Sequence, residues 1–125
     1  MQVLIVDDSA IVRLLLAELL ESVEHVTVVG QAQGVTQAIL ATRNLRPDLV
    51  ILDLDMQDGD GVSVLEAAKR LRPAPTIVIL SHHVDERRRL RCRGAGADFF
   101  LDKSEVFDEV PRIVRELIQA GARHG

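Results

Sequence analysis

The sequence predicts one α/β domain: an open, doubly wound sheet of five parallel strands with helices on both faces. Four short apolar runs, at residues 3–6, 49–52, 77–80 and 99–101, have the length and composition of buried parallel strands. The segments between the runs are long enough for helices. Because crossovers between parallel strands are right-handed, this alternation places helices on both faces of the sheet.

The first unit pairs a strand at residues 3–6 with a helix that Ser9 caps. A stripe of apolar residues is expected to face inward and three charged residues to face solvent. The inward positions are Ile11, Leu15, Leu16, Leu19 and Leu20, and the solvent positions are Arg13, Glu18 and Glu21. Residues 25–30 then predict the second strand.

The second helix is predicted at residues 34–45 and ends before Pro47. Its expected inward positions are Val35, Ala38, Ile39 and Leu45. The third strand covers residues 49–52, and residues 57–61 form a loop before a third helix at residues 62–71. Two prolines, Pro73 and Pro75, then lead into the fourth strand at residues 76–80.

The fourth helix, at residues 84–93, has the weakest pattern, since Val84, Leu90 and Cys92 do not share one stripe. Gly94 and Gly96 lead from it into the fifth strand. The last helix is expected to begin near Asp108, because Pro111 then falls in the first turn, where no backbone donor is needed. Its inward positions are Val110, Ile113, Val114, Leu117 and Ile118.

Composition limits the possible functions. A chain of 125 residues with 47% hydrophobic content fills one core, so residues 1–125 are expected to form a single domain. The formal net charge of −4 argues against general affinity for nucleic acid. A lone cysteine excludes an intrachain disulfide framework, and no apolar run approaches the about 20 residues that cross a bilayer. We therefore expect a cytoplasmic protein without membrane insertion, and no output domain after the last helix.

Polar residues follow the apolar runs at the point where each predicted strand ends. Asp7 and Asp8 follow the first run, Asp53 and Ser81 follow two others, and Lys103 comes shortly after the last. The carboxyl ends of parallel strands meet at one edge of a sheet. Clustered carboxylates repel one another unless a cation relieves them, and Mg²⁺ prefers such oxygen ligands. The ammonium and hydroxyl groups suit phosphoryl oxygens, so the pattern indicates phosphoryl transfer to a carboxylate.

These motifs, in this order, resemble a response-regulator receiver domain of two-component or phosphorelay signalling over almost the whole chain. The matching residues are Asp7, Asp8, Asp53, Asp55, Met56, Gly61, Ser81, Phe100 and Lys103. The resemblance implies the flavodoxin-like receiver fold. It also implies that Asp53 accepts a phosphoryl group from a histidine kinase or phosphotransfer protein.

The resemblance implies further site roles. Asp7, Asp8, Asp53 and the backbone carbonyl of Asp55 would bind Mg²⁺. Lys103 would pair with the acyl phosphate, and Ser81 with Phe100 would form the conformational relay. Such a chain assists its own phosphorylation and dephosphorylation but is not a turnover enzyme on an external substrate.

Signalling is expected to proceed by protein contact. The downstream protein would bind the face made by the helix at residues 84–93, the strand at residues 99–101 and the final helix. The weak pattern of the first of these elements predicts low local stability. Five arginines between residues 87 and 93 are interpreted as a solvated face, without direct nucleic-acid binding.

Three residues depart from the family pattern. Gln57 and Ser104 stand where the family often has proline, and His82 stands where a small residue is usual. Two other function classes stay open: a haloacid-dehalogenase-like, magnesium-dependent phosphohydrolase, and a receiver-like binding module that is never phosphorylated. The motif Asp53-Leu-Asp55 mimics the hydrolase motif, but paired aspartates come last in that family and first here.

Overall fold

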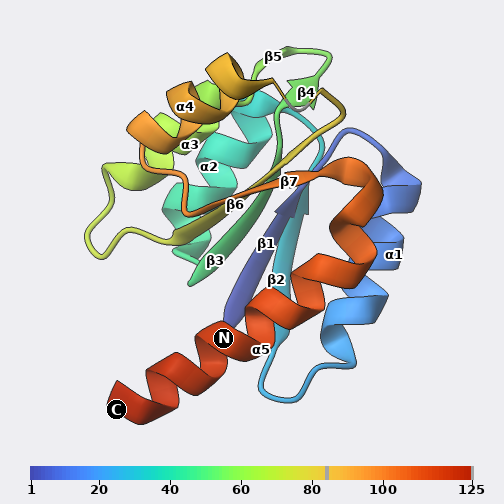
Figure 1. Cartoon of the computed structure of the whole chain (residues 1–125), viewed down its shortest axis with the longest axis vertical. Coiled ribbons are helices and arrows are strands. Elements are labelled where there is room, and N and C mark those ends of the chain that lie inside the picture. Colours follow the sequence, from blue (N-terminus) through green and yellow to red (C-terminus); the bar gives the residue numbers. More distant parts are fainter. Residues whose placement is uncertain (84, 125) are drawn as a thin grey trace.

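The computed structural model has a parallel five-stranded sheet with helices on both faces (Figure 1), which confirms the predicted fold class. The structure describes residues 1–83 and 85–124. The strand order is β2-β1-β3-β6-β7, and each neighbouring pair is parallel. The strands are β1 (Gln2–Val6), β2 (Thr27–Ala32), β3 (Leu49–Asp53), β6 (Thr76–Ser81) and β7 (Phe99–Asp102).

The helices divide between the two faces of the sheet (Figure 1). They are α1 (Ala10–Glu21), α2 (Val35–Leu45), α3 (Val62–Lys69), α4 (Glu86–Gly94) and α5 (Val106–His124). α1 and α5 pack on one face with Val3 and Ile5, and α2, α3 and α4 pack on the other with Leu4 and Val6. Both faces of β1 are therefore buried, which explains its continuous apolar run. Within the described residues, no helix has the length and hydrophobicity that crossing a bilayer requires.

The predicted inward stripe of α1 is partly wrong. Ser9 does cap the helix, since its side chain accepts from the Val12 amide. However, Ile11 is 62% exposed and Leu15 is 44% exposed, whereas Leu16 and Leu20 are fully buried. The buried stripe follows a spacing of four residues through Val12, so an i+4 row of the helix meets the sheet. Leu19 is half-buried, and Glu18 and Glu21 are exposed as expected.

Arg13 is half-buried rather than fully in solvent, because its Nη1 donates to the Asp7 carbonyl at 2.6 Å. The second strand is also displaced from its predicted place. It spans Thr27–Ala32, and His25 lies in the preceding turn with φ 70°. The pairing of β1 with β2 shifts register between Val3 and Leu4, an irregularity that no sequence pattern indicated.

In α2, Ala38 is buried and Val35 and Ile39 pack against the core, as predicted. The prediction that Leu45 faces inward is wrong, because this residue, in the last turn of the helix, is 39% exposed. The buried position is Thr42, whose hydroxyl donates to the Ala38 carbonyl at 2.7 Å and so satisfies itself within the helix.

The predicted loop at residues 57–61 is the second part of a small antiparallel hairpin that begins at Asp55. Its strands are β4 (Asp55–Met56) and β5 (Gly59–Asp60), which lie directly after the carboxyl end of β3. The hairpin was missed because each of its strands has only two residues. α3 begins at Val62 as predicted and ends at Lys69, two residues before the predicted end.

α4 buries little of its surface, as its weak pattern indicated. It begins at Glu86 after the N-cap Asp85, while the predicted start at residue 84 lies outside the described residues. Cys92 is fully buried, but Leu90 is 57% exposed. Few apolar contacts therefore hold this helix on the sheet.

The predicted start of the last helix is wrong. A 3-10 turn (Lys103–Glu105) follows β7, and α5 begins at Val106, which places Pro111 in its second turn. Proline there leaves the Phe107 carbonyl without its usual helical donor, at the cost of one hydrogen bond. All five predicted inward positions do pack against the core. The helix continues to His124, and residue 125 lies outside the described residues.

Candidate functional site

The polar residues that end the strands lie together at the carboxyl edge of the sheet. Asp7 follows β1, Asp53 and Ser81 end β3 and β6, and Lys103 opens the turn after β7. Parallel pairing puts these ends side by side, with Asp53 opposite Leu80 and Ser81 opposite Asp102. This is where ligands of open α/β sheets bind.

Three carboxylates form the acidic cluster of the site. Asp7, Asp8 and Asp53 each offer one oxygen, and the three oxygens lie within 4.8 Å of one another. Asp7 and Asp53 are fully buried, while Asp8 is exposed. The Ser9 amide donates to Asp7 Oδ1 at 2.9 Å, but Asp7 Oδ2 is buried and has no hydrogen-bond donor among the described residues. A buried carboxylate oxygen without an aligned hydrogen bond, next to two more carboxylates, is a suitable ligand for a hard divalent cation.

Lys103 supplies the positive charge of the site. Its Nζ lies 2.8 Å from Asp7 Oδ2, as an ion pair without hydrogen-bond alignment, and 3.2 Å from Asp53 Oδ2. The side chain is only 9% exposed. Burial alone would lower the pKa of Lys103, but its contact with Asp7 and the charge of Asp53 raise it above the ordinary value. Lys103 therefore stays charged between two buried carboxylates.

The surroundings of Asp53 disfavour its charged form. Burial is the main cause that raises the pKa of Asp53 above its ordinary value of 3.8, and the charge of Asp7 raises it further. The Asp55 amide, which donates to Asp53 Oδ1 at 2.9 Å, and Lys103 oppose this rise without cancelling it. A cation at the cluster would relieve the same repulsion.

Gly61 allows the chain to turn closely around the end of β3. A Cβ at this position would lie 2.8 Å from Leu54 Cα and 2.9 Å from the Asp53 carbonyl oxygen, closer than side chains tolerate. The Gly61 amide also donates to the Leu54 carbonyl at 3.4 Å. The glycine of the motif thus holds the hairpin against Asp53.

The side chain of Asp55 is part of the site in a way that the sequence did not reveal. Arg88 of α4 donates to Asp55 Oδ1 at 2.7 Å, and the His82 amide donates to Oδ2 at 3.1 Å. Burial raises the pKa of Asp55, but the bonds from His82 and Arg88 outweigh it and lower the pKa below its ordinary value. Arg88 was missed because it is one of five arginines in one short segment.

Ser81 is fully buried, and its hydroxyl has several partners. Oγ lies 3.0 Å from the His83 carbonyl and 3.4 Å from Asp55 Oδ2, and it accepts from the His83 amide at 3.2 Å. Arg88 Nη1 donates to the same hydroxyl at 3.0 Å. Arg88 thus connects α4 to both Ser81 and Asp55.

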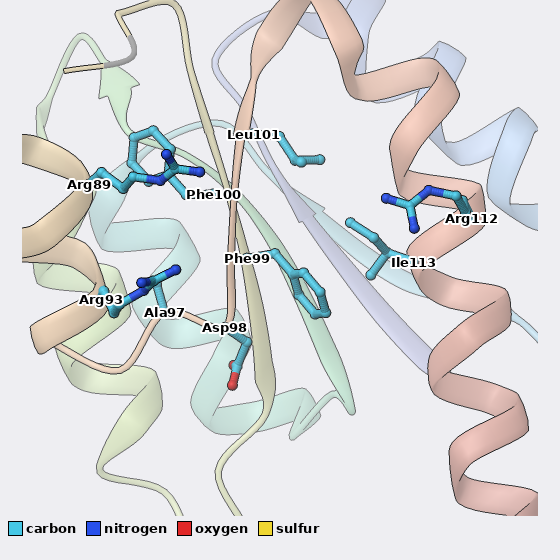
Figure 2. Close-up of a pocket in the computed structure, with 9 residues that line it drawn as sticks. All are labelled: Arg89, Arg93, Ala97, Asp98, Phe99, Phe100, Leu101, Arg112 and Ile113. Atoms are coloured by element: carbon cyan, nitrogen blue, oxygen red, sulfur yellow. The ribbon is translucent and has the colours of Figure 1, made fainter. Parts of the chain in front are cut away.

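Phe100 lies on β7 opposite Ile79 and packs, half-buried, on the face that α2, α3 and α4 cover. Its neighbours Phe99 and Leu101 pack on the other face. Figure 2 shows Phe100 in a pocket of about 190 Å³ beside β7, between α4 and α5. The ring therefore belongs to the surface where the sequence placed a downstream partner.

The three departures from the family pattern line pockets next to Asp8. The exposed residues His82 and Ser104 line a pocket of about 500 Å³ together with Asp8 and Lys103. Gln57 lines a second pocket, of about 310 Å³, on another side of Asp8. The imidazole is thus next to the route to the acidic cluster.

The sequence matches the family model described as "Response regulator receiver domain" over residues 3–115. It is 30% identical over 115 residues to "Response regulator protein VraR" of Staphylococcus saprophyticus, which covers 92% of this chain. The match covers 55% of VraR, so the chain spans about half the length of such curated relatives.

Solved structures agree with this similarity. The response regulator domain of Thermotoga maritima CheB superposes with a TM-score of 0.82 at 26% identity, over 96% of this chain and 94% of that domain. The CheX-CheY-BeF₃-Mg²⁺ complex of Borrelia burgdorferi superposes with a TM-score of 0.77 at 26% identity, over 91% of this chain and 89% of the matched one.

Proposed function

The chain belongs to the response regulator receiver domain family of two-component signalling, and on that premise we propose that Asp53 is its phosphoryl acceptor. The donor is a histidine kinase or a phosphotransfer protein. The bond from phosphorus to the donor's histidine nitrogen breaks as a bond from phosphorus to an Asp53 carboxylate oxygen forms. One observation supports this assignment most strongly: the buried Asp53 carboxylate is close to both Asp7 and Asp8 and also contacts the Lys103 ammonium.

The metal ligands of this proposal are Asp7, Asp8, Asp53 and the backbone carbonyl of Asp55. One oxygen from each of the three carboxylates already lies within 4.8 Å of the others. The buried Oδ2 of Asp7 accepts no aligned hydrogen bond from the described residues, although Lys103 Nζ lies 2.8 Å away. Bound Mg²⁺ would neutralise charge on the phosphoryl oxygens and on the carboxylates. The similar Borrelia structure is a complex of CheY with Mg²⁺ and BeF₃.

Lys103 and Ser81 respond to the new phosphoryl group in this proposal. The Lys103 ammonium, now shared between Asp7 and Asp53, pairs with a phosphoryl oxygen. The Ser81 hydroxyl leaves Arg88 and His83 and donates to another oxygen. Its displacement gives Phe100 room to turn inward, which changes the α4–β7–α5 surface for a downstream protein.

The family match argues against the haloacid-dehalogenase-like reading. The remaining alternative is a binding module that is never phosphorylated. A phosphorylation assay distinguishes this module from a phosphoryl acceptor. Intact mass is measured after incubation with acetyl phosphate and Mg²⁺, beside an Asp53→Asn control and a chelator control. We expect one phosphoryl group on the unmodified chain and none in either control. An adduct that persists in Asp53→Asn would overturn the assignment, and no adduct at all would favour the binding module.

We also propose that residues 1–125 act as one receiver unit that signals through protein contact. The chain is a phosphoacceptor, and it has no turnover activity on an external substrate.

A further inference from the structure

A pocket of about 190 Å³ lies beside β7, the edge strand of the sheet, between α4 and α5 (Figure 2). Cations and apolar groups both line it. The cations are Arg89, Arg93 and Arg112, and the apolar groups include Phe99, Phe100 and Ile113. Two chemistries therefore meet in one small site.

We propose that this pocket binds an acidic segment of a partner protein, in which a carboxylate stands beside a large apolar side chain. The inference rests on the proposed function, because it names the chemistry of the downstream partner. It adds the kind of sequence that the α4–β7–α5 surface selects.

The charge of the pocket is available to a ligand. Arg89 and Arg93 are four residues apart on α4, so their side chains share one face, and both reach toward β7 in Figure 2. No ion pair joins either of them to an acidic group among the described residues. By contrast, Arg112 of α5 is already paired with Glu109 and Glu116. A ligand carboxylate would therefore bind on the α4 side.

The apolar residues of the pocket explain why the partner segment should also carry a large apolar side chain. Phe99 and Phe100 are only half-buried. Figure 2 shows Phe99 beside Ile113 of α5, and Phe100 on the α4 side of β7. An apolar side chain of the partner would cover ring surface that is now open to water. As an edge strand, β7 also offers unpaired backbone groups to an extended segment.

A nucleic acid fits this surface less well. Asp98 also lines the pocket, and Glu109 and Glu116 flank Arg112, so a continuous run of phosphates would meet carboxylates.

The test uses the full chain labelled with ¹⁵N and three blocked hexapeptides. The first is Glu-Glu-Leu-Phe-Glu-Glu, the second replaces each Glu with Gln, and the third replaces Leu-Phe with Gly-Ser. We expect the first peptide to shift amide signals of α4, β7 and α5 and to bind roughly tenfold more tightly than either control. The double variant Arg89→Gln with Arg93→Gln should lose that preference, whereas Arg70→Gln, an exposed arginine on another element, should keep it.

Each other outcome overturns the inference. Equal binding of the acidic and neutral peptides, or none, would remove the charge argument. Tighter binding of a dodecamer of thymidylate at the same residues would indicate a polyanion site. Concentration-dependent shifts on this face without peptide would indicate a second copy. Phosphorylation of the double variant, measured by intact mass, separates this inference from the proposed function, since normal phosphorylation without peptide selectivity contradicts only the former.

Discussion

The Arg88 guanidinium of α4 lies 2.7 Å from the carboxylate of Asp55, two residues after the proposed phosphoryl acceptor. The second arm of the same guanidinium donates to Ser81. Both partners of the ion pair are about three-quarters buried, so water screens them less than a surface pair. A helix with few apolar contacts is thus tied by one side chain to the residues that surround Asp53.

Removing this contact should loosen α4. In Arg88→Ala we expect amide hydrogen exchange in α4 to become about tenfold faster, because a part-buried ion pair and a hydrogen bond to Ser81 are lost. Exchange in α1 and α2 should not change. Arg87→Ala is the matched control, since Arg87 is exposed on the same turn of the helix. Equal exchange in the two variants would show that Arg88 does not restrain the helix.

The raised pKa of Asp53 implies that its charge destabilises the fold. Below the ordinary value of 3.8 the carboxyl is protonated in the folded and unfolded chain, so it has no effect. As the pH rises through 3.8 toward the folded pKa, the unfolded chain ionises first and folding loses free energy. Asp53→Asn should therefore have a larger free energy of unfolding than the unmodified chain at about pH 7.

The measurement is urea unfolding with chelator present, between about pH 4 and pH 8. The difference between Asp53→Asn and the unmodified chain should shrink toward the acid end of this range. A difference that grows on acidification would contradict the direction of the pKa shift. Asp108→Asn offers a control, because that carboxylate is exposed on α5.

Lys103 should support the fold as well as the response. Lys103→Ala leaves Asp7 and Asp53 buried without a cation, so we expect a loss of about 3 kcal/mol in the free energy of unfolding with chelator present. Mg²⁺ should restore part of that loss, since it binds the folded state. A loss that Mg²⁺ leaves unchanged would place the metal elsewhere. Normal partner binding by the phosphorylated variant would show that the response does not need the pairing of Lys103 with the phosphoryl group.

Much of the fold and site could be predicted because β1, β3, β6 and β7 each contain a continuous apolar run that is followed by a polar group. The ends of such runs fix where Asp7, Asp53, Ser81 and Lys103 meet, whatever the details of the helices. The faces of the helices were harder to predict. Leu15 and Leu45 are exposed because the angle at which a helix lies on the sheet decides which apolar row is buried.

Contacts between distant side chains could not be predicted. The choice of Arg88 for Asp55, rather than one of its four arginine neighbours, depends on how α4 is rotated about its axis. The start of α5 was displaced because Asp102 caps a 3-10 turn, with Oδ1 accepting from the Ser104 amide at 2.9 Å. The burial of the helix and the cap at Asp102 therefore decide where α5 begins, and they outweigh the preference of Pro111 for the first turn of a helix.

A phosphoryl group on Asp53 should change the α4–β7–α5 surface. Amide hydrogen exchange of the full chain with Mg²⁺, with and without beryllofluoride as the phosphoryl mimic, measures this change. We expect protection to change in α4 and β7 in the unmodified chain and to stay unchanged in Asp53→Asn. Changes confined to α1 and α2, with α4 and β7 unaffected, would contradict the account.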